Sequence, residues 1–126
     1  MSLSLPQFKM SSHVVLASED PLYRAKLIAA IKHKLGNVSV HVVERVNRLE
    51  AELSMLDHGA MMVIADCDST QCDIGSVAAP FCSAAIDLPL LLVISASDAR
   101  HVRSLVGPRV SCIVKRDKYL SVDTAL

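Results

Sequence analysis

The stretch VVLASEDPLYR, from Val14 to Arg24, decides the fold class. It begins with a short apolar run and continues with Asp20 and Pro21, a favoured N-cap followed by a favoured first helical residue. A short apolar strand that leads directly into a helix is one unit of an α/β protein. In such proteins the turn after the first strand is often where a ligand is held. The acids of this turn therefore raise the question of what they bind.

The turn carries Ser18, Glu19 and Asp20. A phosphate-binding turn is usually rich in glycine, because its bare N–H groups attract an anion, whereas carboxylates repel one. Carboxylates instead suit a hard cation such as Mg²⁺. Helix capping accounts for Asp20 but leaves Glu19 unexplained. The turn therefore favours a cation over a phosphate.

The same alternation continues along the chain. Apolar runs of strand length are followed by segments whose apolar residues recur at helical spacing. Most of the runs are apolar on both faces, which is typical of buried parallel strands. The expected strands are residues 13–18, 38–43, 60–66, 88–95 and 110–115. Joined by right-handed crossovers, they predict a three-layer α/β domain.

Helices are expected between these strands. One apolar stripe ends at Gly36 and a second ends at Gly59, since glycine commonly follows the last helical residue. Pro80 predicts that the third helix is broken or starts late, because proline disrupts a helix interior. A fourth helix is expected from Ser97, as its N-cap, to Val106.

Composition limits the possible functions. The chain has 126 residues and is 52% hydrophobic but only 3% aromatic, which predicts one domain with an aliphatic core. Basic and acidic residues number 13 each, so a sequence-independent grip on nucleic acid or on an anionic membrane is not expected. The longest apolar run is too short to span a bilayer and the first residues contain no signal sequence. We therefore expect a cytoplasmic protein.

Motifs of other protein classes are absent from the sequence. The four cysteines form neither a CxxC pair nor two pairs at zinc-site spacing, which favours free thiols. The sequence contains no GxSxG, GxGxxG, P-loop or HExxH motif, and its five histidines show no ligand spacing. An enzyme of these classes is therefore not expected.

Chemically distinctive residues follow several expected strands. Glu19, Asp66, Ser95 and Lys115 lie where four of them end, and the carboxyl ends of parallel strands meet at one edge of a sheet. Taken singly, Asp66 could cap a turn and Lys115 could be a surface residue. Together they suit phosphoryl transfer to a carboxylate, because acids hold Mg²⁺ while a hydroxyl and an ammonium bind phosphoryl oxygens. Asp66 is the most central and is the expected nucleophile.

From His13 to about Leu126 the chain resembles a receiver domain of a two-component response regulator. The resemblance is carried by ASEDPLYRAKL, MMVIAD, LLLVISA and SCIVKRD, in this order and spacing. It implies a flavodoxin-like (βα)5 fold with five parallel strands in the order 2-1-3-4-5. The implied site consists of the phosphoacceptor Asp66, the phosphate-sensing hydroxyl of Ser95, the salt-bridging Lys115, and a Mg²⁺ pocket formed by Glu19, Asp66 and Asp68.

Three features depart from the family pattern. Ser18 stands where receivers usually carry an acid, and Cys112 replaces a common aromatic. The loop CDSTQCDIG lacks the usual proline and is one residue longer up to Gly75. Asp68 could contribute its backbone carbonyl to the metal, or its side chain in place of the missing acid. These departures leave an alternative function, that of a degenerate pseudo-receiver acting as a phosphate-independent interaction module.

The resemblance also implies partners and domain boundaries. A histidine kinase or phosphotransfer protein would phosphorylate Asp66, with self-phosphorylation and self-dephosphorylation as the only expected activities. Residues 1–12 are expected to be a tail, in part a cloning remnant, and residues 13–126 the receiver-like domain, with a truncated fifth helix. The fourth helix, fifth strand and fifth helix would form a partner or homodimer surface. DNA binding would require a downstream, transcriptional output domain.

Overall fold

The computed structural model describes residues 13–56, 59–68, 73–95, 98, 100 and 102–114. Five parallel strands form one sheet in the order β2-β1-β3-β4-β5, which confirms the predicted strand order. The strands are β1 (His13–Ala17), β2 (Ser39–Val43), β3 (Ala60–Asp66), β4 (Leu90–Ile94) and β5 (Val110–Val114).

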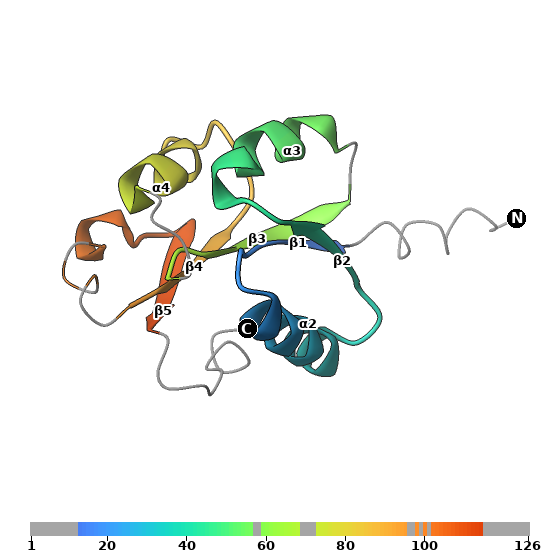
Figure 1. Ribbon diagram of the computed structural model, residues 1–126. Coiled ribbons are helices and arrows are strands. Elements are labelled where there is room, and N and C mark those ends of the chain that lie inside the picture. Colours follow the sequence, from blue (N-terminus) through green and yellow to red (C-terminus); the bar gives the residue numbers. More distant parts are fainter. Residues whose placement is uncertain are drawn as a thin grey trace, which may run out of the picture.

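Helices cover both faces of this sheet, as the predicted three-layer architecture requires. Figure 1 shows α2 on one face and α3 with α4 on the other. The described helices are α2 (Pro21–Leu35), the 3-10 helix η1 (Val46–Arg48), α3 (Leu49–Met55), α4 (Ile74–Cys82) and the 3-10 helix η3 (Arg103–Leu105). None of these helices has both the length and the apolar character needed to cross a membrane.

Helix α2 begins and ends where its sequence predicts. The carboxylate of Asp20 accepts hydrogen bonds from the N–H groups of Leu22 and Tyr23, at 3.0 and 3.2 Å, and so satisfies two of the donors that a helix start leaves unpaired. Gly36 ends the helix with φ 75° and donates its N–H to the carbonyl of Lys32. This left-handed conformation carries little steric cost for glycine.

The prediction that Pro80 breaks or delays the third helix is wrong. Helix α4 starts at Ile74, capped by Asp73, and passes through Pro80 before it ends at Cys82. Proline loses one backbone hydrogen bond and crowds the preceding turn, but here the helix ends only two residues later. Burial of Phe81, which is 1% exposed, stabilises this last turn against the sheet.

The fourth helix is shorter than predicted within the described residues. The expected span was 97–106, whereas the structure has a 3-10 helix over Arg103–Leu105, and Ser97 lies outside the described residues. Val102 is 1% exposed and anchors this segment in the core. Lys115, the expected fifth helix and the tail of residues 1–12 also lie outside the description.

The core has two parts, one on each face of the sheet. Along β1, Val14 and Leu16 pack in the cluster on the α2 face, while Val15 and Ala17 pack in the cluster on the opposite face. The same alternation holds in β3, where Ile64 lies on the α2 face. Because side chains alternate along a strand, the residues that follow β1 and end β3 have predictable directions: both should face α2.

Candidate functional site

Strand register brings three polar residues to one edge of the sheet. Ala17 of β1 lies opposite Ala65 of β3, so Ser18 and Asp66 come next, side by side. Asp66 in turn lies opposite Val93 of β4, and Ser95 follows two residues later. Alternation gives these residues the same face. The predicted meeting of Asp66 and Ser95 at the carboxyl edge is therefore supported by the register.

Asp66 is a buried carboxylate with a donor on each oxygen. Ser18 and Asp66 are both 0% exposed, and the hydroxyl of Ser18 donates to Oδ2 of Asp66 at 2.8 Å. The backbone N–H of Asp68 donates to Oδ1 at 3.2 Å. Burying a charge is costly unless it is hydrogen-bonded, so these donors offset part of the cost of placing an acid here.

The carboxylate of Glu19 is held by a backbone donor of the neighbouring helical segment. Its Oε2 accepts a hydrogen bond from the backbone N–H of Val46 at 3.1 Å, at the start of η1. The guanidinium of Arg24 donates to the carbonyl of Ser18 at 2.9 Å, which ties the turn to α2. Ser18 is thus the turn residue that contacts Asp66, while Glu19 links the turn to η1.

The sequence marks Ser18 only as a departure from the family's usual acid and does not predict its bond to Asp66. A signal for it was present, because Val14 and Leu16 share the face that Ser18 would take. The distance and the donor could not be read from that pattern.

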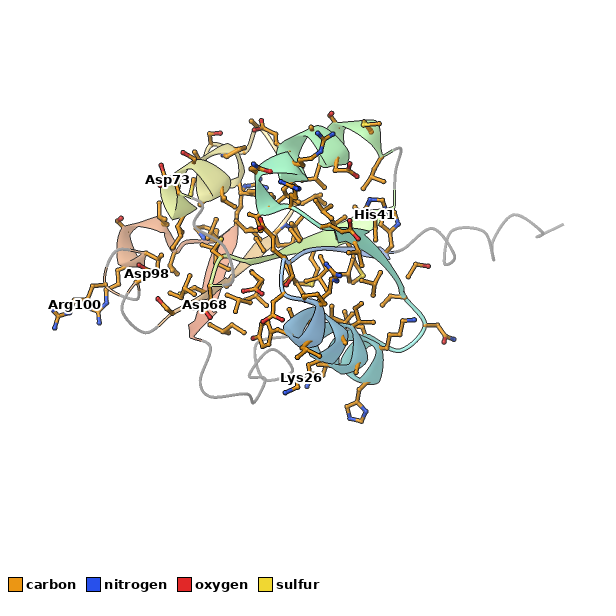
Figure 2. The ribbon with its side chains drawn as sticks, viewed as in Figure 1. Lys26, His41, Asp68, Asp73, Asp98 and Arg100 are labelled. Atoms are coloured by element: carbon orange, nitrogen blue, oxygen red, sulfur yellow. The ribbon has the colours of Figure 1, made fainter. Side chains whose placement is uncertain are left out.

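The hydroxyl of Ser95 also has a partner. It donates to Oδ2 of Asp98 at 2.9 Å, and the backbone N–H of Asp98 donates to the carbonyl of Ser95 at 3.1 Å. The two residues thus close a short turn directly after β4. Figure 2 shows Asp98 on the same side of the molecule as Asp68, which follows the neighbouring strand β3. Asp98 is a second site residue that the sequence did not single out.

The pKa of Tyr23 is raised first by burial and then by the negative charge of this edge. Its side chain is 4% exposed and packs in the cluster on the α2 face. Burial, together with the charges of Asp66 and then Asp68, raises the pKa of Tyr23 to about 12. A field that disfavours a second anion favours a cation, so the edge is electrostatically suited to positive ligands.

The pKa of Tyr23 predicts a loss of stability in alkali. The unfolded tyrosine ionises near its ordinary pKa of 10.0, whereas the folded one ionises at about 12. Tyr23 therefore contributes no pH-dependent change below pH ~10, and folding becomes less favourable as pH rises from ~10 to ~12. We expect Tyr23→Phe to remove this part of the alkaline destabilisation in urea unfolding followed against pH.

Asp66→Asn should lower the pKa of Tyr23, and an unchanged tyrosinate titration in that variant would contradict the proximity of the two side chains.

The carboxylate oxygens at this edge are the kind of ligand that Mg²⁺ prefers. Glu19, Asp66 and Asp68 offer the oxygen ligands that Mg²⁺ prefers, and the two aspartates supply the negative charge felt at Tyr23. In the arrangement observed, however, the described residues contain no group of three or more acids, histidines or cysteines set to hold a metal ion. Oε2 of Glu19 accepts the N–H of Val46, and the carboxylate keeps its other oxygen as an acceptor.

Comparison with known proteins gives the fold a name. No family model matches the sequence, and no curated protein matches it either. Among solved structures, the bacteriophytochrome response regulator AtBRR has a TM-score of 0.68 at 15% identity, with 84% of this chain and 83% of that chain covered.

Two further solved structures are similar. Full-length FixJ from B. japonicum gives a TM-score of 0.64 at 15% identity, with 86% of this chain but only 53% of FixJ covered. This chain therefore spans about half the length of FixJ. An uncharacterized protein from Neptuniibacter caesariensis gives 0.67 at 13% identity, with 84% and 77% covered.

These likenesses define the class of fold. The chain has the flavodoxin-like fold of response regulator receiver domains, with the strand order 2-1-3-4-5. At such low identities the similarity extends to the fold alone, and function has to be argued from the site.

Proposed function

We propose that this chain is a signal-receiver domain in which Asp66 accepts a phosphoryl group. The observation that carries the proposal is the fully buried carboxylate of Asp66 at the end of the central strand β3. An acid at 0% exposure is costly to bury, so its placement at the end of the central strand calls for a reason. A chemical role gives a reason for such an acid at this edge.

The reaction is a phosphoryl transfer to a carboxylate. One oxygen of Asp66 attacks phosphorus, and the bond from phosphorus to the donor atom breaks, with the electron pair of that bond leaving on the donor. The donor atom is the imidazole nitrogen of a phosphohistidine or the acyl oxygen of acetyl phosphate. The hydroxyl of Ser18 and the N–H of Asp68 already donate to the carboxylate, so they orient it for attack. Ser95 and Lys115 are proposed to bind phosphoryl oxygens after transfer.

Magnesium is proposed to be held by Asp66, Asp68 and Glu19, and when bound it would offset negative charge on the phosphoryl oxygens. Ser18 leaves the site with one acid fewer than the family pattern. A cation with fewer anionic ligands keeps more of its water and gains less from the site, so weak affinity is expected.

The proposal is tested by weighing the intact protein after incubation with acetyl phosphate, with and without Mg²⁺. We expect one phosphoryl adduct that requires Mg²⁺ and is absent from Asp66→Asn. Asp73→Asn is the matched control, because Asp73 is an exposed acid that caps α4 and should leave the adduct unchanged. An adduct that persists in Asp66→Asn would place the phosphoryl group elsewhere and refute the assignment.

A second candidate function is a pseudo-receiver that binds a partner without phosphate. Two observations favour it: the hydroxyl of Ser18 occupies one oxygen of Asp66, and Glu19 is engaged by the N–H of Val46. If the chain is a pseudo-receiver, these hydrogen bonds of Asp66 and Glu19 are a fixed part of the structure. Absence of any adduct at high Mg²⁺ would favour this function over the first.

The partners follow from the proposed reaction. The phosphoryl donor would be a histidine kinase or a phosphotransfer protein, and the signal would pass to an output domain, which we propose to be transcriptional.

The surface around η3 and β5 is the proposed partner or homodimer face. Sedimentation at high protein concentration, with and without phosphoryl mimic, tests it: a monomer under both conditions would argue against the dimer.

A further inference from the structure

Two hydroxyl groups at the carboxyl edge are both engaged by acids, but in different ways. Ser18 donates to Asp66 itself, whereas Ser95 donates to Asp98, three residues further along its own loop. A serine hydroxyl has a single proton and can donate it to one acceptor at a time. While Ser95 donates to Asp98, it has no proton left to donate to a group on Asp66.

Ser95 is placed where a phosphoryl group on Asp66 could compete with Asp98 for its hydroxyl proton. Asp66 lies opposite Val93 in the β3–β4 register, and Ser95 follows two residues later on the same face. Its side chain is half-buried, so it lies at the rim of the site. A phosphoryl group on Asp66 would add oxygens that compete with the carboxylate of Asp98 for the hydroxyl proton.

We propose that Asp98 is a latch that holds the hydroxyl of Ser95 away from Asp66 until a phosphoryl group displaces it. This inference rests on the proposed function, since the competing acceptor is the phosphoryl group on Asp66. Asp98 acts through Ser95 and is therefore a positioning residue. The released state differs from the latched one by the bond between the Ser95 hydroxyl and the Asp98 carboxylate.

Displacement of this latch has a structural consequence. The carbonyl of Asp98 accepts the N–H of Val102 at 3.3 Å, and Val102 is a core residue at 1% exposure. Val102 also accepts, through its own carbonyl, the N–H of Leu105 in η3 at 2.9 Å. Asp98 is thus connected to η3 by backbone hydrogen bonds. Movement of Asp98 would therefore shift η3, which lies at the surface of the domain.

A purely structural role for Asp98 makes a different prediction. If the bond only closes the turn after β4, Ser95→Ala and Asp98→Ala each remove it and should have the same effect. If Asp98 is a latch, the two substitutions should change phosphorylation in opposite directions. Ser95→Ala removes a donor to the phosphoryl group, whereas Asp98→Ala frees that donor.

The experiment measures the phosphoryl adduct at steady state with acetyl phosphate and excess Mg²⁺, by intact mass. A hydrogen bond to a charged group is worth enough to change an equilibrium by about tenfold or more. We therefore expect the ratio of adduct to unmodified protein to rise by about tenfold in Asp98→Ala and to fall in Ser95→Ala. Asp98→Asn keeps an acceptor without the charge and should lie between wild type and Asp98→Ala.

The matched control is Asp87→Ala. Asp87 is an exposed acid before β4 that pairs with Arg109, so its removal changes the net charge by the same amount as Asp98→Ala. If the adduct ratio rises equally in both, the effect is one of overall charge and the latch is overturned. A rise confined to the Asp98 variants supports it.

A second readout does not depend on phosphate. Hydrogen–deuterium exchange of the peptide spanning residues 95–105 should be faster in both Asp98→Ala and Ser95→Ala than in wild type, because each removes the bond that closes the turn. Unchanged exchange in both variants would overturn the latch by itself. Equal adduct ratios in wild type and Asp98→Ala would also overturn the latch while leaving the proposed function intact. Absence of adduct from every variant would overturn the proposed function, and the latch with it.

Discussion

Ser18→Asp is expected to destabilise the protein in the absence of divalent metal and to be rescued by Mg²⁺. Ser18 and Asp66 are both 0% exposed, and their oxygens lie 2.8 Å apart. An aspartate at position 18 would replace a hydrogen-bond donor by a second carboxylate. Uncompensated buried charge typically costs ~3–5 kcal/mol, and we expect a loss of free energy of unfolding of this order at neutral pH.

Mg²⁺ should reverse this loss because it binds the folded state preferentially. A ligand present at ~100 times its dissociation constant stabilises the folded state by about 2.7 kcal/mol. The measurement is urea unfolding of wild type and Ser18→Asp in EDTA and in excess Mg²⁺. Lowering the pH should also help the variant, since one proton shared by two adjacent carboxylates relieves their repulsion.

Ser18→Asn is the matched control for shape. It has nearly the size of aspartate but adds no charge, so it should lose less stability in EDTA and gain little more from Mg²⁺ than wild type does. If Mg²⁺ stabilises the three proteins equally, the cation does not bind beside position 18. That result would remove the metal pocket from the proposed function.

The second large effect is expected in the core between α2 and the sheet. Leu27 is 0% exposed and packs in the same cluster as Leu16 and Ile64. Replacing a buried leucine by alanine removes contacts and leaves a cavity, at a cost of ~2–5 kcal/mol. We expect Leu27→Ala to lower the free energy of unfolding by this amount, measured from urea unfolding curves.

Leu22→Ala is the comparison that isolates burial. It is the same substitution in the same helix, but Leu22 is 78% exposed, and exposed substitutions usually change stability by less than about 0.5 kcal/mol. Similar losses in the two variants would mean that α2 does not dock through Leu27. The face of the sheet on which Ser18 and Asp66 also lie would then not be covered by α2 through Leu27.

Local pattern was sufficient for much of the fold. The five strands and the two ends of α2 follow from hydrophobic period, from Asp20 as a cap and from Gly36 as a stop, whereas the strand order came from the family resemblance. These features depend on neighbours within a few residues, so one sequence contains the information. The same pattern brought Asp66 and Ser95 to one edge, because parallel strands of known order share their carboxyl ends.

Packing corrected the pattern where neighbours in space outweighed neighbours in sequence. Pro80 predicted a broken helix, yet α4 includes it because Phe81 is buried against the sheet. The segment after β4 showed helical spacing, yet within the described residues it forms the short helix η3, anchored by Val102. Helical propensity is a weak preference that tertiary contacts override.

The sequence by itself determined that Asp66 and Ser95 end neighbouring strands, and only the tertiary structure decided the partners of the side chains at this edge. That Ser18 donates to Asp66, that Glu19 accepts from Val46, and that Ser95 donates to Asp98 are facts of distance and direction. Two of these bonds join residues that are 48 and 27 positions apart. A hydrogen bond weakens steeply with small changes in geometry, so it depends on strand register and packing that no local pattern specifies.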